Sequence, residues 1–349
     1  MTIFMTNKKL LTLILLLFLS GFVFSQTRPD FFPDNLDNSR ELGIKCYCKP
    51  GLSYQSRSRG AEFVYQYNGA RTYRNTEDMQ TGNIPSEVKS SYLLSANIKV
   101  PLLNKEQYKL LLSFKHTQER FNLSSFGQDF ENIFNEFGNA NFKHSAIGVI
   151  FSHSYNEYNY IAVRGRYVSN GNYARLMDFD SKYSFYNILA FWGRKKTDNL
   201  EWGAGVRFGK NIEGENRIIP FIVYNRNFSD KWGIESVLPS FIFLRYNPSL
   251  KTILFAGIEI ESQNFAFDLE SNTPTDPNTY IFDYSRVLLS ASVEKKIIDW
   301  VWFEVKAGFA MPFNSQFDSV ELPSFEVDPN DYFAFKFGLF ISPPDEFFK

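Results

Sequence analysis

Long runs in which apolar and polar residues strictly alternate are the feature that most restricts the fold of this chain. The segments 199–209, 250–266, 299–312 and 331–342 place apolar side chains at every second position. Period two is the repeat of a β-strand with one apolar and one polar face. The runs reach about ten residues, the length that a tilted strand needs to span a bilayer, whereas soluble strands average about five or six. The alternation therefore predicts strands that cross a membrane.

The fold class predicted is all-β, a single antiparallel transmembrane β-barrel with fourteen strands, or twelve as the alternative. Short charged turns alternate with long connections, as in barrels with short periplasmic turns and long outer loops. A break at Pro239, which cannot serve a central ladder, keeps the long loops on one side, whereas without it 267–282 becomes a long periplasmic loop. A soluble exported β-sandwich is the alternative architecture. The predicted strands are 60–69, 90–101, 107–118, 143–154, 158–169, 182–194, 199–209, 216–226, 231–238, 240–247, 250–266, 283–296, 299–312 and 331–342.

The N-terminus has the parts of a secretory signal peptide. Lys8 and Lys9 precede a 15-residue apolar stretch over 10–24, and Ser25 provides a small residue at the cleavage point. A membrane-anchoring helix is the alternative, but such a helix needs roughly 20 apolar residues. We predict cleavage after Ser25 and location in the cell outer membrane. The predicted regions are the signal peptide 1–25, an N-terminal periplasmic segment or partial strand 26–59, the outer-membrane β-barrel 60–342 and a C-terminal tail 343–349.

The composition supports a barrel in a lipid environment and restricts the partners. Aromatic residues make up 18% of the chain, with 38 Phe and 19 Tyr, which suits a wide apolar belt between two polar interfaces. A net charge of −1 gives no reason to expect nucleic acid as a partner. The expected partners are outer-membrane lipid, the barrel-assembly machinery and a small-molecule solute, with no cofactor and no metal. Cys46 and Cys48 are too close in sequence for an unstrained disulfide, so no role is assigned to them.

The five tryptophans all lie beside predicted short turns. Indole side chains prefer the interface between bilayer and water, so this placement predicts an aromatic girdle at the periplasmic side. Ordinary core tryptophans would be scattered along the chain instead. The predicted girdle consists of Trp192, Trp202, Trp232, Trp300 and Trp302.

Charged residues of both signs fall on the polar faces of the predicted strands. A charged side chain that faces lipid at the bilayer midplane costs roughly 2–4 kcal/mol, so these faces should point into the lumen. The set could line an aqueous channel, or it could fill a narrow barrel with paired charges. The predicted lumen-lining residues are Lys109, Lys115, Arg164, Arg166, Glu201, Arg207, Glu259, Glu261, Arg286, Glu294, Glu304, Lys306 and Lys336.

The predicted loop 119–142 contains an apolar stripe with helical spacing. Ser125 and Gln128 fit a capping box before the stripe, and Gly138 fits a C-terminal stop after it. We predict a short amphipathic helix, which either enters the barrel mouth as a constriction or packs on the rim. Its apolar residues are Phe126, Phe130, Ile133, Phe134 and Phe137.

Catalytic and metal sites find little support in the sequence. His116 and His144 end and begin adjacent strands and could approach each other, but two ligands are too few for a metal, and no nucleophile completes a site. His153 is assigned to a girdle. Asp178 and Asp180 could contribute to calcium binding, although solvated acidic loops are the ordinary interpretation. We therefore predict no catalytic residues, with a lipid hydrolase or acyltransferase as the alternative.

Several segments resemble an uncharacterised, porin-like family of outer-membrane β-barrels from Bacteroidota. They are the signal ending VFSQ, the segment WGIESVLP with the LRY that follows, and the last strand YFAFKFGLFI. One departure is that Ile341 is followed by SPPDEFFK, so the insertion signal that the assembly machinery reads is internal or offset to Phe348. The resemblance implies a barrel but transfers no ligand residues. We predict a passive channel or transporter for small molecules, hydrophobic ones among the options, with a plugged structural or interaction barrel as the alternative.

Overall fold

The computed structural model describes residues 52, 55–57, 59–75, 86–105, 107–125, 131–210, 212, 214–269, 279–319 and 324–342. The predicted signal peptide, the two cysteines, Phe126, Phe130 and the C-terminal tail lie outside the described residues. Among the helices within these ranges, none is long and apolar enough to cross a membrane.

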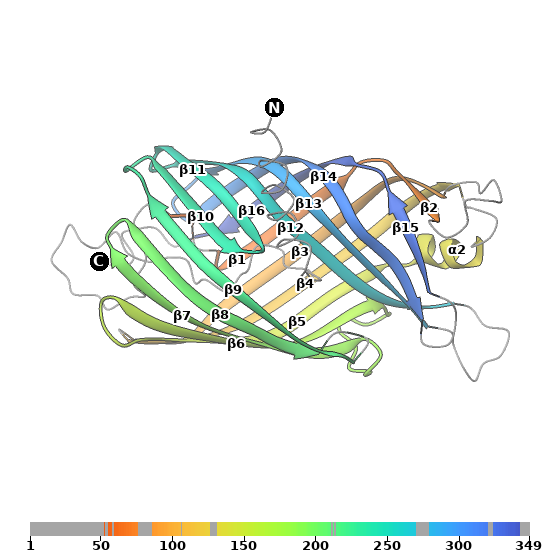
Figure 1. The fold of residues 1–349 in the computed structure, drawn as a ribbon, viewed down its shortest axis with the longest axis horizontal. Coiled ribbons are helices and arrows are strands. Elements are labelled where there is room, and N and C mark those ends of the chain that lie inside the picture. The colour runs from red at the N-terminus through yellow and green to blue at the C-terminus, as the bar shows by residue number, and fades with distance from the viewer. Residues whose placement is uncertain are drawn as a thin grey trace, which may run out of the picture.

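The described chain forms a closed antiparallel β-barrel (Figure 1). Sixteen strand segments form one sheet, in which fourteen strands close the wall and β2 and β15 prolong β1 and β16 at one end. The first strand pairs with the last between Ala61↔Ile341 and Asn68↔Ala334, and this pairing closes the cylinder. The prediction of fourteen strands is confirmed. The strands are β1 (Ala61–Asn68), β2 (Arg71–Asn75), β3 (Ser86–Asn104), β4 (Tyr108–Ser125), β5 (Phe142–Ser154), β6 (Asn159–Asn172), β7 (Ser184–Thr197), β8 (Leu200–Lys210), β9 (Asn216–Asn227), β10 (Trp232–Leu238), β11 (Phe241–Ser249), β12 (Thr252–Asp268), β13 (Thr279–Lys296), β14 (Val301–Ser319), β15 (Phe325–Pro329) and β16 (Tyr332–Ile341).

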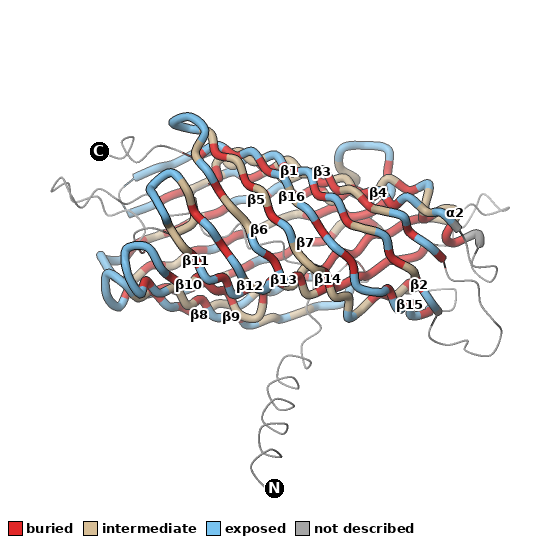
Figure 2. Tube along the Cα trace, turned by 90° about the horizontal axis from the view of Figure 1, so that it is seen from above, coloured by how far each residue is buried: buried red, intermediate tan, exposed pale blue. Residues whose placement is uncertain are grey.

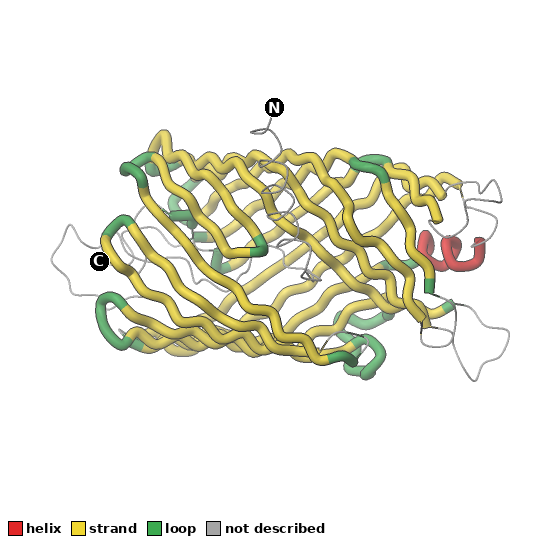
Figure 3. Tube along the Cα trace, in the orientation of Figure 1, coloured by secondary structure: helices red, strands yellow, loops and turns green. Residues whose placement is uncertain are grey.

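The two ends of the barrel differ in their connections. At one end, which we call the short-turn end, all connections are tight, as between β7 and β8 or between β11 and β12. The opposite, long-loop end carries the helix α2 (Glu131–Asn139) between β4 and β5 (Figure 3). The chain turns at Pro239 between β10 and β11, so the predicted break is confirmed. Several strands run further than the sequence predicted, because β4 continues to Ser125 and β14 to Ser319.

Buried and exposed positions alternate along the wall (Figure 2). On β8 the outward-facing Trp202, Val206 and Phe208 are each more than one-third exposed, whereas Glu201 on the inner face is 1% exposed. Large apolar side chains stay exposed all round the outside, and a soluble monomer rarely shows a continuous apolar surface of that kind. A continuous band of exposed apolar side chains is stable in contact with the hydrocarbon of a lipid bilayer. The fold is therefore that of an outer-membrane-type barrel. Period two arises from lipid outside and an interior filled by both charged and aromatic side chains.

The wall is incomplete toward the long-loop end, between β9 and β12. In the described chain, β10 pairs with β9 only from Ile222 to Asn227, and β11 pairs with β12 only as far as Glu259. Beyond the tip of the β10–β11 hairpin, β9 and β12 diverge (Figure 1). A parallel pair between Gly171 of β6 and Ala266 of β12 then joins the two sides above this point. We call the region enclosed by the hairpin tip, β9, β12 and this pair the window.

Candidate functional site

One side of the lumen is filled with paired charges. We call this side, formed by the inner faces of β1, β10–β14 and β16, the ion-pair wall. Lys306 Nζ lies 2.5 Å from Glu259 Oε1, and Arg286 Nε lies 2.8 Å from Glu261 Oε2. Arg286 also donates to Asn68 and to Tyr332. Glu259, Arg286 and Lys306 are each less than 7% exposed, so their attractions are poorly screened by water.

The chain that precedes β1 enters this wall from the short-turn end. Arg59 contacts Glu294 at 2.5 Å and Glu304 at 2.9 Å, both on the inner face of the barrel, and it also pairs with Glu62. These carboxylates outweigh the opposing effect of burial and hold the pKa of Arg59 well above its ordinary value. Within the predicted N-terminal region, the described residues before β1 are therefore neither a strand nor outside the barrel.

Two further residues of this entering segment are anchored in the lumen. Ser56 donates to Glu235 through its backbone N–H (2.9 Å) and its hydroxyl (2.8 Å). The Arg57 guanidinium lies 5.1 Å from the ring centroid of Trp302. We call residues 52–59 the N-terminal plug, of which Leu52, Gln55, Ser56, Arg57 and Arg59 are described.

An aromatic cluster fills the mouth at the long-loop end. The helix α2 turns Ile133, Phe134 and Phe137 inward, and Phe137 is completely buried. Phe137 packs on inward-facing rings of the wall, with ring centroids 4.6 Å from Phe121 and 4.8 Å from Phe282. The helix thus enters the mouth, and does not only pack on its rim. Burying a phenylalanine side chain stabilises by roughly 1.5–3 kcal/mol, so this closure is firmly seated.

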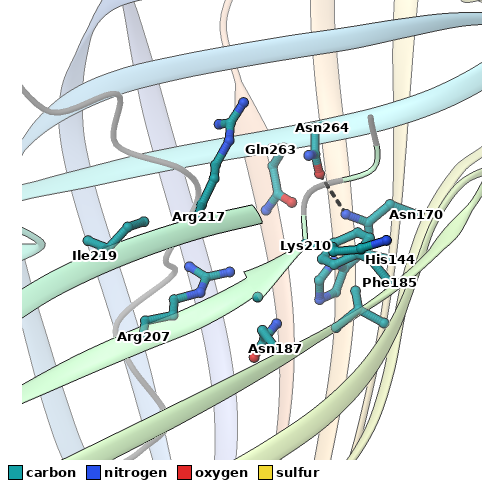
Figure 4. Close-up of a pocket in the computed structure, with 12 residues that line it drawn as sticks. His144, Asn170, Phe185, Asn187, Arg207, Lys210, Arg217, Ile219, Gln263 and Asn264 are labelled. Atoms are coloured by element: carbon teal, nitrogen blue, oxygen red, sulfur yellow. Dashed lines mark hydrogen bonds between the residues drawn. The ribbon is translucent and has the colours of Figure 1, made fainter. Parts of the chain in front are cut away.

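A polar cavity of about 60 Å³ lies behind the window (Figure 4). Its lining comes from β5 to β9 on one side and from β12 on the other. Arg207 and Arg217 reach it from β8 and β9, and His144 reaches it from β5. Asn170 and Asn264 lie across the window from each other and form a 2.8 Å hydrogen bond beside the cavity.

The strand register gathers basic side chains around this cavity. Arg166, Asn187, Gly209 and Arg217 are successive partners across β6 to β9. Arg207 lies on the same inner face, two residues before Gly209. We call the inner faces of β4 and β6 to β9 around the cavity the cationic wall, and its basic residues are Lys115, Arg164, Arg166, Arg207 and Arg217. No Asp or Glu stands among the described residues that line the cavity, and Arg217 pairs with the exposed loop residue Glu215, 3.1 Å away.

The remaining members of the predicted lumen set also face inward. Glu201 accepts hydrogen bonds from Tyr160 (2.5 Å) and Asn225 (3.0 Å), and Lys336 Nζ lies 3.4 Å from Glu304. Lys109 is 8% exposed on the inner face of β4. The sequence did not single out Arg217 as a lumen residue. Arg217 alternates with the outward-facing Ile218 on β9, and this alternation indicates that Arg217 faces the lumen.

The predicted approach of His116 to His144 is wrong. His116 pairs with Ser145 in the register and hydrogen-bonds to its hydroxyl at 2.8 Å, whereas His144 pairs with Thr117. A shift of one residue turns the two rings to opposite faces of the sheet, His116 outward and His144 toward the cavity. His153 stacks on Tyr108 with ring centroids 4.4 Å apart. The described residues contain no group of three or more side chains suited to a metal ion.

Trp302 does not belong to the girdle. It is 2% exposed on the inner face of β14 and stacks on Phe340, whereas Trp300 is 38% exposed. Trp302 shares its parity with Glu304 and Lys306, which the sequence placed in the lumen, and that parity decides its direction. The tryptophans on the outer face are Trp192, Trp202, Trp232 and Trp300.

The acidic loop between β6 and β7 uses its carboxylates locally. Asp178 accepts a hydrogen bond from the backbone N–H of Asp180, and Asp180 accepts one from that of Lys182. Beside them, Lys182 Nζ lies 2.8 Å from Asp268 Oδ2 on β12. The loop thus fastens β6 to β12 above the window. We call the Gly171–Ala266 pair together with the Lys182–Asp268 ion pair the clasp.

A comparison with protein families identifies the chain. Residues 53–342 match the model of DUF6268, described as a domain of unknown function. The chain belongs to this family. The match concerns the family alone, so the expected origin in Bacteroidota stays a prediction. A search of the curated proteins finds no match.

Solved structures of several barrel types are similar to this member of DUF6268. A Pseudomonas aeruginosa FadL homologue is 9% identical with a TM-score of 0.44, over 81% of this chain and 90% of its own. The COG4313 outer membrane channel from Pseudomonas putida F1 is 8% identical with a TM-score of 0.41, over 83% and 98%. The β domain of the Bordetella autotransporter Brka is 11% identical with a TM-score of 0.33, over 82% and 100%. These values do not discriminate between functions.

Proposed function

We propose that the protein is an outer-membrane channel that admits small molecules through the window and is closed at rest by two of its own segments. The observation that carries this proposal is the window itself. A barrel wall gains stability from every strand pair, and here β9 and β12 leave their facing edges unpaired beside a polar cavity. Such an interruption would let solutes pass between strands, whereas a barrel that only encloses its lumen gains nothing from it.

The two closures support a channel that opens on demand. The N-terminal plug is held by polar contacts from Ser56 and Arg59, and water can replace these contacts once the segment leaves the lumen. The mouth is held by apolar contacts around Phe137, which a hydrophobic solute could replace. A wide, permanently water-filled pore would need neither closure. The apolar belt and the predicted signal peptide support the outer membrane as the location, with outer-membrane lipid and the assembly machinery as partners.

Conductance in planar bilayers tests this function. The full chain should give little or no steady conductance, and removal of residues 52–59 should give discrete openings, because the carboxylates of the ion-pair wall would then face water. The double variant Ser56→Ala with Arg59→Gln should open the channel intermittently. Lys231→Gln, which changes an exposed lysine in a short turn, is the matched control and should behave like the full chain. Silent bilayers for both plug variants, despite correct heat-modifiable folding, would contradict a channel.

A plugged structural or interaction barrel is the second candidate. The specific observation in its favour is that both ends of the lumen hold tightly packed protein, the plug at one end and α2 at the other. It predicts silent bilayers for every plug variant. It also predicts a co-purifying partner that is lost when the loop with α2 is deleted.

We also propose that the barrel catalyses no reaction. The support is that His116 and His144 lie on opposite faces of the sheet, where they cannot act together on one substrate. Replacing both by alanine should leave any lipid or ester turnover of the purified protein unchanged. A loss of turnover in that variant would revive the lipid-modifying alternative.

A further inference from the structure

The cavity behind the window contains polar atoms with unused hydrogen-bonding capacity. Arg207 Nη1, His144 Nδ1 and Asn187 Oδ1 are buried from solvent and have no hydrogen-bond partner. A buried polar group without a partner costs roughly 1–3 kcal/mol, and more when it is charged. Three such atoms around one cavity indicate that the site is complete only with a bound group.

The charge around the cavity defines the sign of that group. Arg166 acts electrostatically on Arg207, and Lys115, Arg166 and Arg207 all act on His144. The described residues that line the cavity include no Asp or Glu. Like charges held together away from water repel strongly, so a negative ligand would relieve the repulsion. An oxyanion accepts bidentate hydrogen bonds from a guanidinium, and an asparagine amide can rotate to present its nitrogen.

The size of the cavity limits what part of a molecule it can hold. A water molecule needs about 10–15 Å³ of such volume, so about 60 Å³ accommodates a group of only a few heavy atoms. Phosphate and carboxylate have that size. A larger ligand must therefore leave most of its structure outside, in the window or beyond it.

Apolar outer surface borders the cavity on the β9 side. On β12 the exposed Ile258 gives way toward the long-loop end to the buried Ser262 and Asn264, and Asn264 lines the cavity. On β9 the exposed Ile218 lies between Arg217 and Ile219, which both line the cavity. An apolar chain that leaves the cavity on this side therefore meets exposed apolar surface on β9.

We propose that this cavity binds the oxyanion headgroup, a phosphate or a carboxylate, of an amphiphile whose apolar tail lies along the exposed edge of β9. Arg207 and His144 bind the oxyanion, and Asn187 completes the cage from β7. That such an amphiphile passes through the barrel rests on the proposed function. Binding at the cavity is measurable whether or not the barrel conducts.

Binding of dodecyl phosphate to the purified full chain in dodecyl maltoside tests the proposal. Calorimetry should detect one saturable site in the full chain. Arg207→Gln should weaken it about ten- to a hundredfold, because a charge-assisted hydrogen bond disappears. His144→Ala should weaken it less, and Arg226→Gln, an exposed arginine at the other end of β9, should leave the affinity unchanged.

Two further ligands identify the source of the oxyanion. Weak binding of inorganic phosphate with the same dependence on Arg207 supports the cavity and shows that the alkyl chain adds affinity. Inorganic phosphate that binds as tightly as dodecyl phosphate supports the oxyanion cage but overturns the amphiphile. Equal affinity of Arg207→Gln and the full chain for every probe would overturn the site. Because binding needs no conductance, silent bilayers together with normal binding would reject only the channel.

Discussion

The ion-pair wall and the cationic wall face each other across one lumen, and they differ in how their charges are balanced. Each places charged side chains on inner faces whose outer sides contact lipid. On the ion-pair wall, Glu259 and Glu261 each have a basic partner within the protein. On the cationic wall, Arg207 presents a buried nitrogen atom without any partner. The difference indicates that the first wall balances its charges within the fold, whereas the second offers a buried guanidinium nitrogen to a ligand.

The largest expected effect comes from breaking one pair of the ion-pair wall. Glu259→Gln leaves the buried ammonium of Lys306 without its carboxylate, which should lower the free energy of unfolding by about 3–5 kcal/mol. Urea unfolding in lipid vesicles measures the loss. As the matched control, Glu215→Gln on the cationic side removes an exposed carboxylate and should cost less than about 1 kcal/mol. Equal losses of unfolding free energy in the two variants would contradict the difference between the two walls.

An increase in the free energy of unfolding is expected when a carboxylate is added to the cationic wall. Asn187→Asp places a negative charge directly across from Arg166 and next to Arg207, and should raise the free energy of unfolding by about 1.5–3 kcal/mol. It should also abolish dodecyl phosphate binding, because the new carboxylate occupies the anion's place. Asn225→Asp is the control, since Asn225 donates to Glu201 and the same change there brings two carboxylates together. Destabilisation by both variants would indicate that the cationic wall needs no negative charge.

A smaller effect is expected from loosening the clasp. At Gly171 the backbone φ is +155°, and a side-chain Cβ would lie 2.5 Å from the carbonyl oxygen of Ala266. Gly171→Val should therefore cost about 1–3 kcal/mol and speed hydrogen exchange of the amides near Ala266. Gly165→Val on the same strand has open space around it and serves as the control. Unchanged exchange at β12 in Gly171→Val would show that the clasp does not hold the window.

The smallest effect is expected at Arg57 of the plug. Arg57→Gln removes the contact with the Trp302 ring and should cost about 0.5–1 kcal/mol, because cation–π contacts near a surface are weak. Arg59→Gln removes contacts to buried carboxylates and should expose the plug to protease much more readily. Rates of limited proteolysis compare the two variants. Faster cleavage in Arg57→Gln than in Arg59→Gln would show that the plug is not held mainly by the ion-pair wall.

The sequence predicts most of the barrel because period two is a local signal. Alternation identifies each strand and its lipid-facing side, and the position of Pro239 fixes the strand count. The amphipathic stripe identifies α2, although it cannot say whether the helix enters the mouth. That choice depends on rings from distant strands, such as Phe282, which meet Phe137 only in the folded barrel.

The candidate site was less accessible from the sequence, because it depends on register between strands. Parity gives the face of Arg166 and Arg207, but only the pairing shows that they gather around Asn187. The joining of Gly171 to Ala266 has no local signature either, since it links strands that are not neighbours in the chain. Trp302 was misassigned because proximity to a turn was weighed above its parity with Glu304.

The position of a bound oxyanion in the full chain tests the contrast between the two walls most directly. A crystal soaked in tungstate should show an anomalous peak within hydrogen-bond distance of Arg207 Nη1 and His144 Nδ1, two buried nitrogen atoms that lack partners. The peak should vanish in Arg207→Gln. A peak among Lys306 and Lys336 with none behind the window would contradict the account, because the ion-pair wall would then be the side that folding leaves incomplete.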